Sequence, residues 1–514
     1  MKSASQNVYE LFIESCKKNL DRSAIFIKER TYSYQEFLSI ASAIKKQIQS
    51  KKDFSKMIGI YTHESVNTYA AMWSIVSLGG AYVPINKKFP AERAKGMMED
   101  AGLNVLLYSE DGAEIEELKA LLNGKVEFIK METVANGELD FSYNENITGD
   151  DYIYLLFTSG STGKPKGVPI RHKNLVSLID GHLYDPKYNV NKDDRYLQMF
   201  ELTFDVSVLS YVFPLVMGAC FYVVPQDGIM YMEVLKILED QKITIAYMVP
   251  SVINYLQPYF DQIQLPDLKC CMFAGEALFE KPLVDWQKCT PNGFVGNAYG
   301  PTEATVIVTE YVWDNAISPE ETYNGIVPIG HMLGETIGYI VNDKDQEVPQ
   351  GDKGELLLIG PQVTTHYWND EEKSAKSFVT IQYKGQERNA YRTGDLCYLN
   401  ERGNIMYCGR IDHQVQVNGY RVELGEIEFH SKKFLGNEKN LVAFPIKNTM
   451  GSTAVYMAIE GFDKTQEEAL VSYLRKNLPV YMIPEKIIAV DALPLTISGK
   501  TDRGKLSTVY QPNN

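Results

Sequence analysis

The amino-acid sequence predicts a layered α/β protein whose C-terminal end forms a small α+β unit. First, short apolar runs of strand type alternate with helix-type patterns along most of the chain, as helices do when they cover parallel sheets. Second, a chain of 514 residues is too long for one ordinary core and predicts two or more domains. Third, the alternation stops after about residue 410.

The alternation is plain in the first 110 residues. MIGIYTHE (57–64) predicts a strand, ESVNTYAAMWSIVSLGG (64–80) an apolar helix, and AYVPI (81–85) the next strand. Further strands are predicted for LNVLLYSE, ACFYVVP, ITIAYMVP and LKCCMFAGE. The segment 206–225 carries no charge, but Pro214 and Gly218 favour a buried helix followed by a strand over a membrane span.

The C-terminal pattern differs from the rest. LVAFPIKN and TAVYMAIEG predict a hairpin, and EEALVSYLRKNL predicts the helix that follows it. The join falls near GRIDHQVQVNGYR (409–421), which divides the chain into residues 1–411 and residues 412–514.

Composition excludes several classes of protein. A formal net charge of −15 offers no basic field to a nucleic acid. The start of the chain lacks the basic and apolar regions of a signal peptide, and seven cysteines in no metal-binding spacing suit a reducing compartment. We therefore expect a cytoplasmic protein without membrane insertion or nucleic-acid partner.

The stretch YLLFTSGSTGKPKGVP (154–169) predicts a phosphate-binding loop after a buried strand. Its hydroxyls, glycines and lysines can surround an anion that has several oxygens. A Walker A loop is rejected, because the glycines are three apart and Pro165 stands where the serine or threonine for magnesium is needed. A flexible surface linker is the alternative for this composition.

Polar residues also follow other predicted strands, where α/β proteins bind ligands. In VGNAYGPTEATV (295–306), Tyr299 could stack on a purine and Glu303 could hold Mg²⁺ against phosphates. In YRTGDLCYL, Asp395 is expected in a tight turn after Gly394, where it could accept hydrogen bonds from a ribose. Taken singly, such residues are more often turn formers.

Two cationic residues complete the motifs. Arg410 of MYCGRID is a candidate partner for a phosphate or a ribose, and Lys500 of SGKTDRGKL lies on a Ser-Gly turn. A lone lysine in such a turn is usually exposed to solvent and has no specific role.

In this combination and order, the motifs resemble the ANL adenylate-forming enzymes, and among them the amino-acid adenylation domains that load carrier proteins. The resemblance spans SLGGAYVPIN, FDVS, FAGEAL, NAYGPTE, GELLLIG, YRTGD, GRID and SGKTDRGKL. It implies a large N-terminal core of layered α/β subdomains and a mobile C-terminal lid that rotates about a hinge at Asp412. It also implies two half-reactions: a carboxylate attacks the α-phosphate of MgATP, and a phosphopantetheine thiol then attacks the resulting adenylate.

The resemblance also implies the site residues. Lys500 would bridge the substrate carboxylate and the α-phosphate, and Glu303 would hold magnesium. ATP would be bound by Thr158, Ser159, Gly160, Ser161, Thr162, Gly163, Lys164, Lys166, Asn297, Ala298, Tyr299, Gly300, Thr302, Asp395, Tyr407, Arg410 and Lys500.

Asp205 distinguishes the substrate classes. In amino-acid-activating members the matching aspartate pairs with the substrate ammonium, and a buried carboxylate is costly without a cation; helix capping is the alternative role. The side-chain pocket would be lined by uncharged residues, which imply a small or medium neutral amino acid: Val206, Leu209, Tyr247, Met272, Ala274, Ala298, Val306 and Ile307.

Three functions remain open at this point. The favoured one is an AMP-forming amino acid–carrier protein ligase whose carrier is a separate protein, since the chain ends soon after Leu506. Its length and TEATV motif resemble D-alanine–carrier protein ligases, although Ala274 stands where those ligases usually have cysteine and Ala298 where they often have threonine. An acyl-CoA synthetase is the second candidate, and a non-catalytic nucleotide-binding relative is the third.

Overall fold

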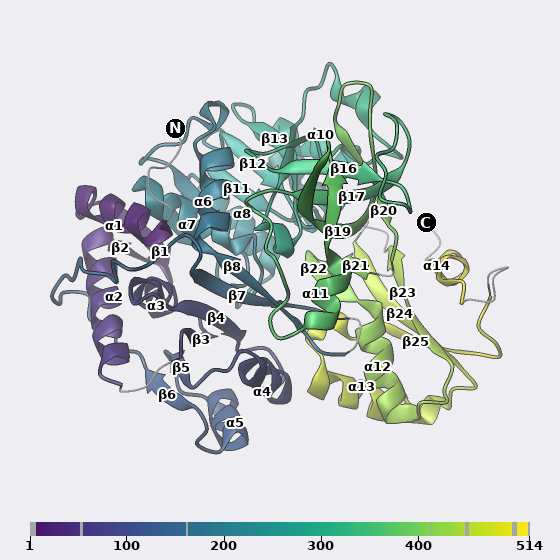
Figure 1. The fold of residues 1–514 in the computed structure, drawn as a ribbon, viewed down its shortest axis with the longest axis horizontal. Helices are drawn as coiled ribbons and strands as arrows, with labels where there is room; N and C mark the ends of the chain where they lie inside the picture. The colour runs from purple at the N-terminus through teal and green to yellow at the C-terminus, as the bar shows by residue number, and fades with distance from the viewer. Residues whose placement is uncertain are drawn as a thin grey trace.

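The computed structural model of the chain describes residues 7–51, 55–160, 163–412, 414–447, 452–495 and 501–511. It has the predicted fold class: a large N-terminal part of sheets covered by helices, and a smaller C-terminal part at one corner (Figure 1). Among the described residues, no helix is both long and apolar enough to cross a membrane.

The first sheet carries the predicted phosphate-binding loop. Its neighbouring strands pair in parallel except for the last, β8, which is antiparallel to β7. In spatial order the strands are β6 (Glu127–Lys130), β5 (Val105–Tyr108), β3 (Met57–Thr62), β4 (Ala81–Asn86), β7 (Tyr152–Thr158) and β8 (Lys166–Arg171).

The second sheet has nine strands with a parallel centre and antiparallel edges. Cys270 and Cys271 lie in β12 as buried core residues, as the sequence predicts. In spatial order the strands are β15 (His331–Met332), β14 (Thr309–Val312), β13 (Phe294–Tyr299), β12 (Cys270–Phe273), β11 (Ile245–Met248), β9 (Arg195–Gln198), β10 (Cys220–Val223), β1 (Ser23–Ile27) and β2 (Arg30–Ser33).

The third sheet is wholly antiparallel, which the expectation of mostly parallel sheets did not include. Hairpin connections, with few helices between strands, produce this pattern. Its strands are β16 (Ile337–Val341), β17 (Gly354–Ile359), β19 (Gln386–Leu399), β18 (Phe378–Tyr383) and β20 (Ile405–Arg410).

Helices fill the space around these sheets, and one apolar cluster joins the two large sheets. The helix α3 is buried along its whole length because its sequence carries no charge and is mostly apolar. The helices before residue 400 are α1 (Val8–Lys18), α2 (Tyr34–Gln49), α3 (Val66–Ser77), α4 (Ala91–Asp100), α5 (Ala113–Leu122), α6 (His172–Leu178), α7 (Ser207–Met217), α8 (Met230–Asp240), α9 (Pro250–Leu256), α10 (Glu280–Cys289) and α11 (Glu371–Ser377).

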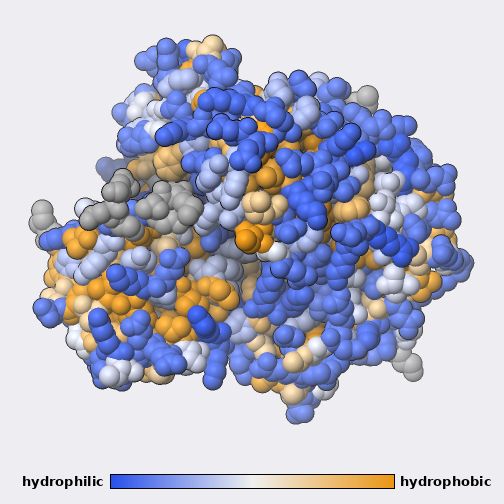
Figure 2. Space-filling model, turned by 180° about the vertical axis from the view of Figure 1, so that it is seen from behind, coloured by the Kyte–Doolittle hydropathy of each residue, from blue (hydrophilic) through white to orange (hydrophobic). Residues whose placement is uncertain are grey.

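Residues 412–514, which we call the lid, have their own small cores. The predicted hairpin is present as β23 and β24, and β25 pairs with β24 in parallel. Seen from behind, the protein is mostly hydrophilic, and hydrophobic residues gather toward the lid at lower left (Figure 2). The lid elements are β21 (Gln414–Val417), β22 (Tyr420–Glu423), α12 (Leu424–Leu435), β23 (Leu441–Lys447), β24 (Thr453–Glu460), α13 (Glu467–Asn477), β25 (Lys486–Val490) and α14 (Arg503–Tyr510).

Candidate active site

The predicted phosphate-binding loop connects β7 and β8 as a hairpin, with Thr158 opposite Lys166. Gly160 is required there, because a Cβ atom at this position would lie 1.9 Å from the carbonyl oxygen of Lys164. Lys166 is buried, and burial lowers the pKa of its ammonium group. Lys164 is exposed, whereas Ser161 and Thr162 lie outside the described residues.

Glu303 lies in a short 3-10 turn (Thr302–Ala304) that follows β13. The next residues, Thr305 and Val306, have φ values of +58° and +73°, a conformation that is unfavourable for β-branched residues. The Thr305 hydroxyl donates a 2.6 Å hydrogen bond to the carbonyl oxygen of Gln362, which helps to hold this turn. The strain therefore lies in the loop that presents Glu303 and Val306.

Tyr299, Asp395 and Arg410 meet on one wall, which we call the ribose wall after the predicted role of Asp395 and Arg410. The Tyr299 hydroxyl donates to one Asp395 oxygen, and Arg410 Nη1 donates to the other at 3.0 Å. Burial raises the pKa of Asp395 although Arg410 opposes it. Arg410 also pairs with Asp412, the predicted hinge residue.

The expectation of a tight turn at Asp395 is wrong. Asp395 lies inside the long strand β19, at a register shift opposite β20. Gly394 has a φ of +70°, so the glycine produces an irregularity within the strand and no reversal of the chain. The irregularity still turns the Asp395 side chain toward Tyr299 and Arg410.

A cavity of about 650 Å³ joins the ribose wall to Asp205, and lid residues such as Gln414 and Arg421 line part of it. Glu303 lies behind its surface and is fully buried. Of the predicted residues, the cavity is lined by Asp205, Val206, Ala274, Asn297, Ala298, Tyr299, Gly300, Thr302, Val306, Asp395, Tyr407, Arg410 and Asp412. Thr158 and Ser159 line a smaller adjacent cavity, which also contains Asp205 and Thr302.

Asp205 is only 5% exposed, and within the described chain no lysine or arginine forms an ion pair with it. Burial raises the pKa of its carboxyl group to about 6, while Thr302 and Arg421 oppose the shift and Glu303 adds to it. A buried carboxylate next to an empty volume is a favourable place for a small cation.

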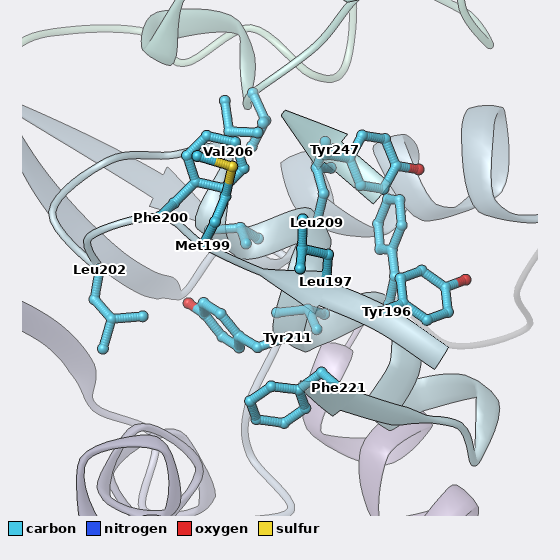
Figure 3. Close-up of a cluster of buried hydrophobic side chains, with 14 of the residues drawn as sticks. Tyr196, Leu197, Met199, Phe200, Leu202, Val206, Leu209, Tyr211, Phe221 and Tyr247 are labelled. Atoms are coloured by element: carbon cyan, nitrogen blue, oxygen red, sulfur yellow. The ribbon is translucent and has the colours of Figure 1, made fainter. Parts of the chain in front are cut away.

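The other predicted pocket residues, Leu209, Tyr247, Met272 and Ile307, are packed in the core and do not line the cavity. Figure 3 shows Val206, Leu209 and Tyr247 together in the apolar cluster. The Tyr247 hydroxyl lies 2.7 Å from His182 Nε2, a buried partner that the sequence did not indicate. The roles of these four residues in a substrate pocket remain predictions.

The lid hairpin β21–β22 reaches this site and adds residues that the sequence analysis missed. Arg421 Nη1 lies 2.8 Å from one Glu303 oxygen and 3.1 Å from the other. Although burial opposes ionisation, Arg421 and Lys166 lower the pKa of Glu303 to about 2. The signal for Arg421 in the sequence is the NGYR segment next to the domain join, where an arginine follows a glycine turn.

Two further lid contacts fix the hairpin. The Gly419 N–H donates a 2.6 Å hydrogen bond to Glu276, in the FAGEAL motif of the core. The Ser159 hydroxyl donates to the carbonyl oxygen of Arg421 at 2.8 Å. The lid is therefore docked against both the cavity and the phosphate-binding loop; Lys500 lies outside the described residues.

The described residues contain no group of three or more histidine, cysteine, aspartate or glutamate side chains that could hold a metal. Magnesium does not need such a group, since it is usually bound through one or two carboxylates together with substrate phosphates. Glu303 beside the phosphate-binding loop fits this kind of site, provided that Arg421 leaves its carboxylate.

Comparison with known proteins identifies the family. The sequence matches the AMP-binding enzyme family over residues 12–368 and the AMP-binding enzyme C-terminal domain over residues 442–500. The chain belongs to the AMP-binding enzyme family. This assignment confirms the resemblance to adenylate-forming enzymes and the prediction of an AMP-forming ligase.

Individual relatives agree with this assignment. Zwittermicin A synthase ZmaJ of Bacillus cereus is 30% identical over 97% of this chain and 94% of that protein. Gramicidin S synthase 2 of Aneurinibacillus migulanus is 30% identical over 98% of this chain, which spans only 11% of that protein. The Vibrio cholerae adenylation domain AlmE, solved with glycyl-adenosine-5'-phosphate, has a TM-score of 0.82 at 25% identity and covers 99% of this chain and 98% of its own. The closer likeness to D-alanine ligases remains a prediction.

Proposed function

We propose that the chain activates a small or medium neutral amino acid as aminoacyl-AMP and transfers it to the phosphopantetheine thiol of a carrier protein. The observation that carries the proposal is the buried Asp205 carboxylate, which faces the cavity without an ion-pair partner among the described residues. An α-ammonium group would supply the missing cation. The uncharged lining from Val206, Ala274, Ala298 and Val306 supports a neutral side chain.

The first half-reaction follows from this arrangement. The ammonium bound at Asp205 would orient the substrate carboxylate toward an α-phosphate, while the ribose wall would hold the ribose. Mg²⁺ bound at Glu303 would neutralise charge on the phosphates. Lys500 is proposed to bridge the carboxylate and the α-phosphate, as the family resemblance implies.

Amino-acid-dependent ATP–pyrophosphate exchange tests the proposal, with a panel of D- and L-amino acids as substrates. We expect exchange with at least one neutral amino acid, and a steep rise in its KM in Asp205→Asn. Exchange with fatty or aryl acids alone, followed by transfer to CoA, would instead support an acyl-CoA synthetase. A protein that catalyses no exchange but binds ATP would support the non-catalytic relative.

We also propose that residues 412–514 move as the lid about Asp412. The thiol needs access to the adenylate that Lys500 helps to form, and one lid placement does not serve both steps. Asp412→Pro fixes φ near −65°. We expect it to impair one half-reaction and spare the other; equal retention of both would place the hinge elsewhere.

A further inference from the structure

A buried chain of polar groups, which we call the His182 network, joins β11, β14 and a π-helical turn (Ile179–Leu183). His182 Nδ1 lies 3.1 Å from Glu310 Oε2, and His182 Nε2 lies 2.7 Å from the Tyr247 hydroxyl. The Tyr188 hydroxyl donates to Glu310, and Lys187 forms an ion pair with the same carboxylate. Turns of the π type are frequent at functional sites, and the proposed reaction assigns no role to this one.

The partners of His182 fix the direction of both of its hydrogen bonds. A glutamate carboxylate only accepts hydrogen bonds, so His182 Nδ1 carries the proton and donates to Glu310. In the neutral ring, Nε2 is then the acceptor for the Tyr247 hydroxyl. Burial raises the pKa of Tyr247 well above its usual value, so this hydroxyl keeps the proton that it donates. The Tyr247 side chain is therefore held at its far end by a buried hydrogen bond.

Tyr247 belongs to the layer of side chains next to the cavity. It pairs in register with Met272 of β12, and Ala274, two positions further along the same strand, points to the same face as Met272 and lines the cavity. Met272 is fully buried and fills the space beside Gly296, where a Cβ atom would lie 2.9 Å from the Met272 sulfur. The Tyr247 hydroxyl points away from Val206, which also lines the cavity (Figure 3). Tyr247 and Met272 thus occupy the layer into which a longer substrate side chain would extend.

We propose that His182 is a positioning residue that restricts the substrate to a small amino acid such as glycine or alanine. The inference rests on the proposed function and narrows its substrate class. By holding the Tyr247 hydroxyl, His182 keeps the Tyr247 ring packed in the core and closes the cavity at that layer. The side chain of an amino acid whose ammonium pairs with Asp205 then has room only among the alanine and valine side chains of the uncharged lining.

A merely structural role for the His182 network must be separated from this one. Loss of a buried hydrogen bond destabilises the fold, and the smaller folded fraction lowers the activity with every substrate alike. Loss of a positional restraint frees the Tyr247 ring, and this changes the ratio of the activities with long and short side chains. The ratio is measured within one variant, so it does not depend on how much of the protein is folded.

ATP–pyrophosphate exchange by the full chain with an unbranched series of amino acids tests the inference. The series is glycine, alanine, 2-aminobutyrate and norvaline, in the configuration that the wild type accepts. One methylene group in an apolar pocket changes kcat/KM by roughly 10- to 200-fold, so the wild-type value for norvaline should be at least about 100-fold below that for alanine. In His182→Ala, which also leaves space for the Tyr247 ring, the ratio of norvaline to alanine should rise at least about 10-fold. Tyr247→Phe should change the ratio in the same direction by a smaller factor.

Two control variants make the test specific to the hydrogen bond. His182→Gln keeps an amide oxygen that can accept from the Tyr247 hydroxyl, so it should retain the wild-type ratio. Tyr196→Phe is the matched control for Tyr247→Phe, because Tyr196 is a buried tyrosine of the neighbouring strand β9 whose hydroxyl has no hydrogen-bond partner within the described part of the chain. It should leave the ratio unchanged.

The outcomes distinguish this inference from the proposed function. Wild-type exchange that is as efficient with norvaline or a larger neutral amino acid as with alanine would overturn this inference alone. An unchanged ratio in His182→Ala, or a ratio raised equally in His182→Gln, would do the same. Absence of exchange with every neutral amino acid of the D and L panel would overturn the proposed function with it.

Discussion

The two ends of the proposed nucleotide site differ in where their charges are balanced. On the ribose wall, Asp395 and Arg410 pair with each other, and both lie in strands of the same core sheet. On the phosphate side, Glu303, Lys166 and the Gly160 N–H are all matched by groups of the lid. The Asp395–Arg410 ion pair forms within the core, whereas the groups on the phosphate side have their partners in the lid.

This difference indicates a division of roles. A wall whose charges are balanced inside one rigid sheet keeps its geometry whichever way the lid lies. A loop whose donors bind either a ligand or the lid has different partners in the two half-reactions, so its state depends on which step has been completed. Mutations on the two sides should therefore have different signatures: one independent of the lid, and one specific to a half-reaction.

The largest expected effect comes from Asp395→Asn on the ribose wall. Asp395 would lose the charge of the group that accepts hydrogen bonds from the ribose, and a hydrogen bond to a charged group contributes roughly 1.5–3 kcal/mol. Affinities for AMP and for α,β-methylene-ATP, which carries an uncleavable phosphate tail, should therefore both fall about 100-fold. Calorimetry measures both. A loss confined to the nucleotide with the tail would contradict the assignment of this wall to the ribose.

On the phosphate side, Arg421→Gln should affect the two half-reactions differently. Glu303 loses its lid partner, and a hydrogen bond to a charged group contributes roughly 1.5–3 kcal/mol, so thiol transfer should slow roughly 10- to 100-fold. Amino-acid-dependent pyrophosphate exchange, for which we propose a different placement of the lid, should be retained. Equal loss of both activities would mean that Arg421 does not act through the docked placement.

Asp205 lies between the two sides, and its protonation offers a test by pH. Its pKa is raised to about 6, so below that pH the carboxyl becomes neutral and loses its attraction for an ammonium group. The value of kcat/KM for the amino acid should fall about tenfold per pH unit below 6, since this parameter follows groups of the free enzyme. Asp205→Asn should lower the plateau and remove this dependence; an unchanged profile would show that another group titrates.

The sequence was sufficient to predict the elements that depend on a local pattern of apolar and polar residues. The strands β3 and β4, the buried helix α3 and the lid hairpin β23–β24 were all predicted, because period and burial reveal such elements directly. The residues of the ribose wall were also named, although the strand irregularity at Gly394 was mistaken for a turn. A tight turn and an irregularity within a strand can both require a positive φ, which favours glycine, so the presence of Gly394 could not distinguish them.

What could not be predicted depends on contacts between distant segments. Arg421 and Glu303 are 118 positions apart, and Gly160 and Glu426 are 266 apart. No periodicity links such pairs. The left-handed conformation of Val306 was equally hidden, because a β-branched residue gives no sign of it and the surrounding loop imposes it.

The smallest expected effect concerns the second partner of Arg410. Asp412 pairs with the same guanidinium as Asp395, but its side chain is 50% exposed, compared with 7% for Asp395. Exposed ion pairs contribute at most about 1 kcal/mol, so Asp412→Ala should weaken AMP binding no more than about 5-fold, measured by the same calorimetry as for Asp395→Asn. A loss as large as that of Asp395→Asn would mean that the ribose wall is not independent of the hinge segment. An unchanged AMP affinity with an altered ratio of the two half-reactions would instead assign the Asp412 side chain to lid movement alone.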